Sequence, residues 1–214
     1  MKTKRRNNIS TEAATLHKDA LVWDSHGCMP QTIDRLSGAI EQLSRYREGG
    51  VDICHINIGD AYQPLESLTR MAAFMRHWIK AHASDYRLAT SVADIEEAKA
   101  NGQLAVAFDI EGGHAVQDQL SLLDLFYDLG VRWMLLSYNK TNALAGGCHD
   151  EDPGLSDRGR AFVAEMARLG MITCCSHTGY KTVMDVFDVA SNPVIFSHSN
   201  ARTLRDHPRT CPMN

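Results

Sequence analysis

A chain of 214 residues, 44% of them hydrophobic, is long enough to bury a substantial core and most simply forms one domain. Its formal net charge of −4 comes from interspersed acidic and basic side chains, which excludes the broad basic surface of a nucleic-acid-binding protein. No run in the sequence approaches the ~18 consecutive apolar residues of a membrane span, so no membrane segment is expected.

The cysteines and the N-terminal residues indicate the compartment. Residues 1–8, MKTKRRNN, are basic but lack the apolar run of a secretory signal, which predicts a solvated tail. The six cysteines lack the compact spacing of a disulfide framework, and two of them adjoin within a predicted buried strand. They stand at positions 28, 54, 148, 174, 175 and 211. This usage predicts a reducing, cytoplasmic location.

The first predicted elements are a helix capped by Ser10 or Thr11 and a strand within LVWDSHGCMP. If that strand persists to its end, Asp24, His26 and Cys28 share one face. Imidazole and thiolate are both good zinc ligands, and a one-residue gap on a strand lets both reach one ion. His-x-Cys alone is a weak signal. Its position at the end of the first strand strengthens it.

Helical and extended patterns then alternate along the chain. The predicted elements are a helix over residues 33–48, a strand over 51–59, a helix over 65–83, an extended piece over 86–90 and a helix over 92–100 capped by Ser91. His55 in the second strand has no partner at a ligand spacing, so a structural role is the simpler interpretation.

A carboxylate ends the next strand, in QLAVAFDIEGGHA. Glu111 precedes two glycines that permit a tight turn, which suits a metal-bridging ligand or a general base, although a salt-bridged rim residue has the same pattern. His114 in the following loop is expected at the surface. After an apolar helix over residues 121–129, VRWMLLSYN predicts a strand that ends in Tyr138, and a glycine-rich loop follows.

The same unit, an apolar run that ends in Ser-His, occurs twice near the C-terminus. The runs are MITCCSH and PVIFSH, with predicted helices over residues 157–169 and 180–190. They would place His177 and His198 at the ends of neighbouring strands, and two such histidines favour a metal site over a structural role. Arg202, Arg205 or Arg209 could bind a substrate carboxylate in a bidentate fork, and position alone does not choose among them.

About six β/α units follow one another, which allows either a doubly wound sheet or a TIM-type barrel. The candidate site residues stand at the ends of many strands, and only a barrel brings all those ends to one mouth. We therefore expect an α/β fold of the (β/α)8 barrel type. Residues 1–20 are expected to form the tail and first helix, and residues 21–214 a single barrel domain.

Several motifs together resemble the membrane (renal) dipeptidase family, zinc peptidases of the amidohydrolase superfamily. They are WDSHGCMP, FDIEGGHA, GVRWMLLSYNKTN, GLSDRGRAFVAEMARLGMITCCSH and SNPVIFSHSNARTLRDHPR. The resemblance implies a (β/α)8 barrel with zinc at its mouth that hydrolyses dipeptides, including some with a C-terminal D-residue. It also implies residue roles: His26 as a ligand of the first metal, Glu111 as the bridge between both metals, His177 and His198 as ligands of the second, and Arg209 on the substrate carboxylate.

The chain departs from the family pattern in three ways. Cys28 stands where the family usually has aspartate, and a softer thiolate ligand could alter or weaken the first metal. Tyr138 stands where the family usually has a histidine that contacts the reacting carbonyl, and its hydroxyl can still donate a hydrogen bond to an oxyanion. The chain also holds only about six of eight expected units, so we expect a barrel truncated at its C-terminal end.

The leading hypothesis is a metal-dependent dipeptidase in which one or two zinc ions activate water and Tyr138 and Arg209 contact a small dipeptide-like substrate. Two alternatives remain open. One is an enzyme of the same class that acts on a lactone, an N-acyl amino acid or another small amide. The other is a metal-binding pseudoenzyme. Assembly as a homodimer is also left open by the sequence.

Overall fold

The computed structural model describes residues 9–116 and 118–210, so the predicted tail at residues 1–8 lies outside the described residues. The strands are β1 (Trp23–Gly27), β2 (Ile53–Asp60), β3 (Tyr86–Leu88), β4 (Leu104–Glu111), β5 (Val131–Leu135) and β6 (Ile172–Cys174). The helices are α1 (Thr11–Asp19), α2 (Ile33–Ser37), α3 (Ser44–Glu48), α4 (Leu65–Ala81), α5 (Val92–Ala100), α6 (Leu122–Leu129), α7 (Asp157–Leu169) and α8 (Tyr180–Val189).

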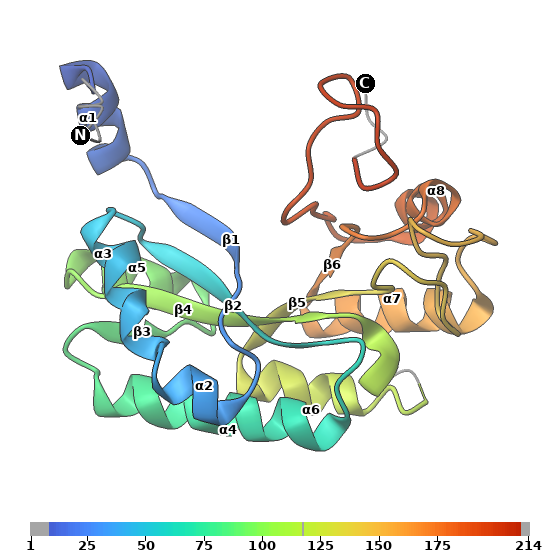
Figure 1. Ribbon diagram of the computed structural model, residues 1–214, viewed down its shortest axis with the longest axis horizontal. Helices are drawn as coiled ribbons and strands as arrows, with labels where there is room; N and C mark the ends of the chain where they lie inside the picture. The colour runs from blue at the N-terminus through green and yellow to red at the C-terminus, as the bar shows by residue number, and fades with distance from the viewer. Residues whose placement is uncertain (1–8, 117, 211–214) are drawn as a thin grey trace, which may run out of the picture.

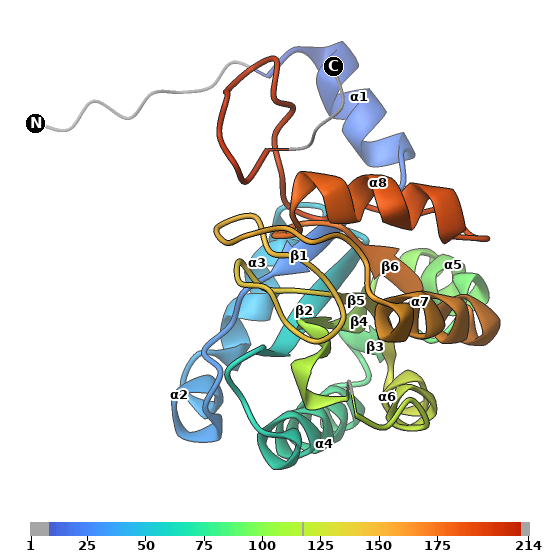
Figure 2. The ribbon, with the colours of Figure 1, turned by 90° about the vertical axis from the view of Figure 1, so that its right-hand side faces the viewer.

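The strands form one parallel sheet in the order β1-β2-β4-β5-β6, with β3 paired to the start of β4. The sheet curls into a half-barrel, and α4, α6 and α7 pack on its outer side (Figures 1 and 2). Because all pairs are parallel, the strands end at the same edge of the sheet, and the loops at that edge carry the site. The expected α/β barrel architecture is confirmed to this extent.

The burial of these strands is the pattern expected of a parallel sheet. All eight residues of β4 are buried, as expected of a strand covered on both faces. The covering helices present apolar stripes at helical spacing, such as Leu68, Met71 and Met75 on α4. Left-handed glycines end two of the helices, Gly130 with φ 108° after α6 and Gly170 with φ 80° after α7.

Two predictions about local structure are wrong. The helix expected over residues 33–48 is divided into α2, a 3-10 turn over Ile40–Leu43 and α3. Gly38 ends α2, and Ala39, with φ −121°, leaves helical geometry before the chain turns again. Leu36, Ile40 and Leu43 are nevertheless all buried in the core.

The predicted final strand, PVIFSH, is the second error. It forms only an isolated bridge between Ile195 and Cys174, and β6 itself ends at Cys174. Pro193 has no N–H for a ladder, and the Ser176 hydroxyl accepts a hydrogen bond from the backbone N–H of His198 at 3.2 Å. His177 and His198 therefore lie in loops beyond the strands. His177 has a left-handed backbone with φ 63°.

The N-terminus of α5 provides a test of local stability. The Ser91 hydroxyl accepts from the N–H of Asp94 at 3.2 Å, and the Asp94 carboxylate accepts from the N–H of Ser91 at 3.0 Å. This capping box satisfies two backbone donors. We expect Ser91→Ala to lower the free energy of unfolding by ~1 kcal/mol in a urea titration. Ser84→Ala, at an exposed position, should change it by less than ~0.5 kcal/mol.

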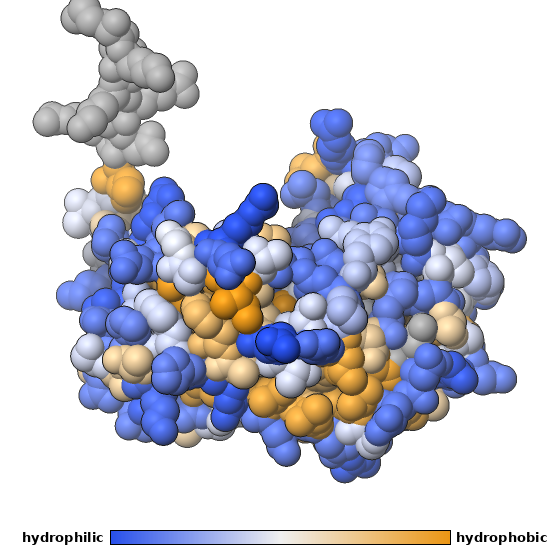
Figure 3. All heavy atoms as spheres, turned by 60° about the horizontal axis from the view of Figure 1, so that its bottom comes forward, coloured by the Kyte–Doolittle hydropathy of each residue, from blue (hydrophilic) through white to orange (hydrophobic). Residues whose placement is uncertain are grey.

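The outer surface of the half-barrel is mixed in character. On the face that carries α4 and α6, apolar residues gather in the middle and charged residues surround them (Figure 3). Leu125 of α6 is among the exposed apolar side chains. No helix within residues 9–116 and 118–210 combines the length and the hydropathy needed to cross a bilayer.

Candidate metal centre

Four side chains from distant parts of the chain converge at the carboxyl edge of the sheet. His26 lies on β1, Glu111 ends β4, and His177 and His198 come from the loops after β6 and after the Ile195 bridge. The Oε1 atom of Glu111 lies 3.5 Å from His26 Nε2, 3.2 Å from His177 Nε2 and 3.1 Å from His198 Nε2. One carboxylate oxygen therefore lies near three imidazole nitrogens.

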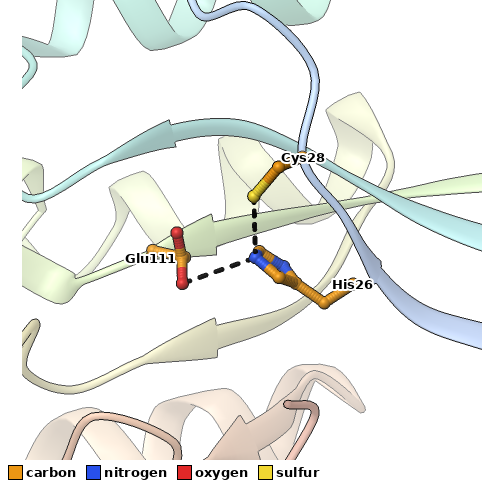
Figure 4. Close-up of side chains that lie close together, drawn as sticks. All are labelled: His26, Cys28 and Glu111. Atoms are coloured by element: carbon orange, nitrogen blue, oxygen red, sulfur yellow. Dashed lines mark hydrogen bonds and ion pairs between the residues drawn. The ribbon is translucent and has the colours of Figure 1, made fainter.

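Cys28 joins this cluster from the loop after β1. Its Sγ atom lies 3.2 Å from His26 Nε2, so the thiol and Glu111 approach the same ring nitrogen (Figure 4). Two sets of donor atoms result, His26–Cys28–Glu111 and Glu111–His177–His198, and within each set the atoms lie within 4.8 Å of one another. Glu111 belongs to both sets.

The other ring nitrogen of each histidine has its own protein partner. His26 Nδ1 lies 3.3 Å from Asp109 Oδ2, His177 Nδ1 lies 2.8 Å from Asn139 Oδ1, and His198 Nδ1 lies 2.8 Å from Ser197 Oγ. Such partners fix the orientation of metal-ligating histidines and raise their basicity. All three Nε2 atoms are consequently directed toward Glu111.

The protonation of His177 suits a cation between its Nε2 atom and the Glu111 carboxylate. Asn139 Oδ1 can only accept, so the His177 proton lies on Nδ1, and its Nε2 lone pair faces the Glu111 carboxylate. Burial lowers the pKa of His177, which favours this neutral form. Two acceptors that face each other at 3.2 Å are stabilised by a cation between them. Imidazole, carboxylate and thiolate together are donors that zinc prefers.

Electrostatics distinguish His26 from the other two histidines. Burial opposes its charge, but hydrogen bonds to Asp109 and Cys28 raise the pKa of His26 to about 10. Burial raises the pKa of Asp109 to about 6, although His26 opposes that rise. Burial acts to raise the pKa of Glu111, but the neighbouring imidazoles of His26, His177 and His198 lower it to about 2. A metal ion would replace the proton on His26 Nε2.

Tyr138 and Arg209 lie beside the cluster. The ring of Tyr138 stacks on His177 with centroids 4.2 Å apart, and burial together with the charge of Glu111 raises the pKa of its hydroxyl. Arg209 is half-buried in a pocket that His198 also lines, and its Nη1 atom is buried and has no hydrogen-bond partner among residues 9–116 and 118–210. The structure thus brings all seven predicted site residues to one mouth.

Two further histidines, His55 and His114, belong to neither donor set. His55 is buried in the sheet, where its Nδ1 accepts from Trp23 Nε1 at 2.9 Å and burial lowers its pKa to about 3. His114, expected at the surface, is half-buried, and the Asn142 amide lies 3.4 Å from its Nδ1 atom.

Sequence reasoning missed the residues that orient the ligands. Asp109 precedes Glu111 by two positions on β4, so strand alternation could have placed both on one face. Asn139 and Ser197 are direct neighbours of predicted site residues, but their loop conformations carry no sequence signal.

Comparison with known proteins identifies the family of this chain. The profile of the membrane dipeptidase family, peptidase family M19, matches residues 11–213. The chain belongs to this family. It is 42% identical over 114 residues to an uncharacterised dipeptidase of Schizosaccharomyces pombe, a match that covers 51% of this chain and 27% of that protein. It is 35% identical over 162 residues to the dipeptidase tcpJ of Claviceps purpurea, covering 74% of this chain and 36% of that protein.

A solved structure shares the fold. An amidohydrolase from Pseudomonas aeruginosa superposes with a TM-score of 0.84 at 29% identity, over 92% of this chain and 58% of that one. The chain thus spans about a quarter to a third of the length of the two curated M19 relatives and more than half of this structure.

Proposed function

We propose that this M19 protein is a zinc-dependent hydrolase that cleaves the peptide bond of dipeptides or dipeptide-like substrates. The observation that carries the proposal is the convergence of three imidazole Nε2 atoms on one Glu111 oxygen, within 3.5 Å, at the carboxyl edge of the sheet. The names of the curated relatives support a dipeptide as the substrate.

The ligands of the proposed metal site are His26, Cys28, Glu111, His177 and His198, which could hold one or two ions. A zinc ion bound there supplies Lewis acidity and lowers the pKa of water from ~16 toward ~7. Glu111, shared by both donor sets, would bridge two ions or fix the position of a single one.

The remaining residues act on the substrate. The Arg209 guanidinium suits a bidentate pair with the substrate carboxylate, because its Nη1 atom has no partner in the part of the chain that the structure describes. The Tyr138 hydroxyl would donate a hydrogen bond to the carbonyl oxygen as negative charge develops on it. These contacts hold the peptide bond against the metal cluster in a reactive orientation.

A substrate panel tests this proposal on zinc-loaded protein. Dipeptides with a free carboxylate, including ones with a C-terminal D-residue, should be hydrolysed, whereas the corresponding dipeptide amides should not. Turnover of lactones or N-acyl amino acids in place of dipeptides would favour the alternative enzyme class, motivated by Cys28 and Tyr138. Zinc binding with no turnover on any amide or ester would identify a pseudoenzyme.

Arg209→Met should raise KM for dipeptides by about 10- to 100-fold, because a hydrogen bond to a charged group contributes ~1.5–3 kcal/mol. The variant keeps the length of the side chain but loses its charge and donors. Steady-state kinetics measure the change. Arg70→Met, at an exposed position on α4, is the matched control and should leave KM unchanged. Equal KM values in both variants would contradict the role of Arg209.

We further propose a cytoplasmic location, which is supported by the buried free thiols of Cys54 and Cys174. Assembly as a homodimer is a separate proposal, and light scattering of the purified protein tests it.

A further inference from the structure

Behind His26 lies a chain of amide side chains that the proposed reaction does not use. Gln63 Nε2 donates to Gln31 Oε1 at 3.0 Å, and Gln31 Nε2 donates to Asn57 Oδ1 at 2.6 Å. Asn57 Nδ2 then donates to Asp109 Oδ1 at 2.9 Å, and the other oxygen of Asp109 faces His26 Nδ1. Every amide in the chain donates in the same direction, toward Asp109.

The fold sets the positions of these amide side chains relative to one another. Asn57 and Asp109 are paired residues of the adjacent strands β2 and β4, so their side chains leave the sheet side by side. Gln31 comes from the loop after β1, and Gln63 from the loop after β2. Both loops lie at the edge of the sheet that carries the metal centre.

Gly59 leaves the space that the last amide needs. A Cβ atom at this position would collide with Gln63 Oε1 and with Leu68 Cδ2. The Gln63 amide can therefore fold over the backbone of β2 and reach Gln31. Asn57 is 3% exposed, so an unpaired amide at this position would lower the stability of the protein.

We propose that Asn57 and Gln31 are positioning residues that act on the metal centre through Asp109. The directed donors hold Asp109 with one oxygen turned to His26 Nδ1, so His26 keeps its proton there and presents Nε2 to the metal. Because the series of hydrogen-bonded amides begins in the loops after β1 and β2, it also couples the position of those loops to the orientation of His26. The inference rests on the proposed metal site but not on the substrate or on turnover.

Zinc affinity tests the inference. Asn57→Leu replaces the amide oxygen and nitrogen by methyl groups in a side chain of similar shape and should raise the zinc dissociation constant about 10- to 100-fold in a chelator competition. Gln31→Met should have a smaller effect in the same direction, and Gln63→Met the smallest. Gln119→Met makes the same chemical change at an exposed glutamine, whose side-chain amide donates to Ser121 Oγ at 3.0 Å, and should bind zinc like the unaltered protein.

A second readout separates positioning from simple structural support. In the zinc-bound protein, two-bond 1H–15N correlations should show His26 protonated at Nδ1 with slow proton exchange, and that exchange should accelerate in Asn57→Leu and Gln31→Met. A merely structural role would lower the Tm of the metal-free protein and leave both readouts unchanged, which would overturn the inference.

Each outcome is decisive even if one variant does not fold. Gln31 is half-buried in a loop, so Gln31→Met carries the test should Asn57→Leu fail to fold. Unaltered zinc affinity together with a slowly exchanging His26 proton in the folded variants would overturn the positioning role. Absence of hydrolysis in a protein that binds zinc would count against the proposed function alone.

Discussion

Glu111→Gln should abolish tight metal binding and lower kcat/KM for dipeptides by about 1,000-fold or more, which corresponds to ~4 kcal/mol of transition-state stabilisation. The amide has nearly the same shape but lacks the negative charge that balances a cation among His26, His177 and His198. It also presents an N–H where the carboxylate accepts. Because both donor sets share Glu111, the loss affects each of them.

Two measurements are needed for this variant. Zinc content by elemental analysis shows whether the metal is lost, and kinetics at saturating zinc show whether activity depends on the carboxylate itself. Glu96→Gln, at an exposed position of α5, is the matched control and should retain both the zinc content and the activity. If Glu111→Gln kept near-full activity at equal metal content, the central role of Glu111 would be wrong.

Local sequence signals predicted the parts of this fold that local forces decide. Ser91 as the cap of α5 and Glu111 at the end of β4 both follow from patterns of a few residues. The family motifs also name the ligands that the structure brings together. These features need no knowledge of distant contacts.

Long-range packing decides the features that local sequence signals did not predict. The final predicted strand fails because Pro193 lacks an N–H and the Ser176 hydroxyl accepts from the N–H of His198. The proline is visible in PVIFSH, but the contact with Ser176 is not. Asn57, Gln31 and Gln63 reach Asp109 only because β2 and β4 are neighbours and Gly59 lacks a side chain. In the sequence they are ordinary polar residues at loops and on a strand, with no spacing that links them to His26.

Cys28 belongs to only one of the two donor sets, and its removal should change the number of metal ions. Its Sγ atom lies 3.2 Å from His26 Nε2, in a donor set that includes Glu111 but neither His177 nor His198. We therefore expect Cys28→Ala to lose one of two zinc ions and to retain the ion held by the other set. Dipeptide turnover should fall about 100-fold or more, since removing one ion costs several kcal/mol of charge stabilisation.

Cys28→Asp is the matched variant, because it restores the carboxylate of the family pattern. It should bind two zinc ions, and its cobalt-loaded form should lack the thiolate-to-cobalt charge-transfer band that we expect of the unaltered protein. If Cys28→Ala kept two ions, the thiol would be a bystander beside an intact centre. If the unaltered protein held one zinc ion and Cys28→Asp held two, this protein would work with a single metal on Glu111, His177 and His198. Catalysis would then depend on His26 as a charged residue that Asp109 orients, and no longer as a ligand.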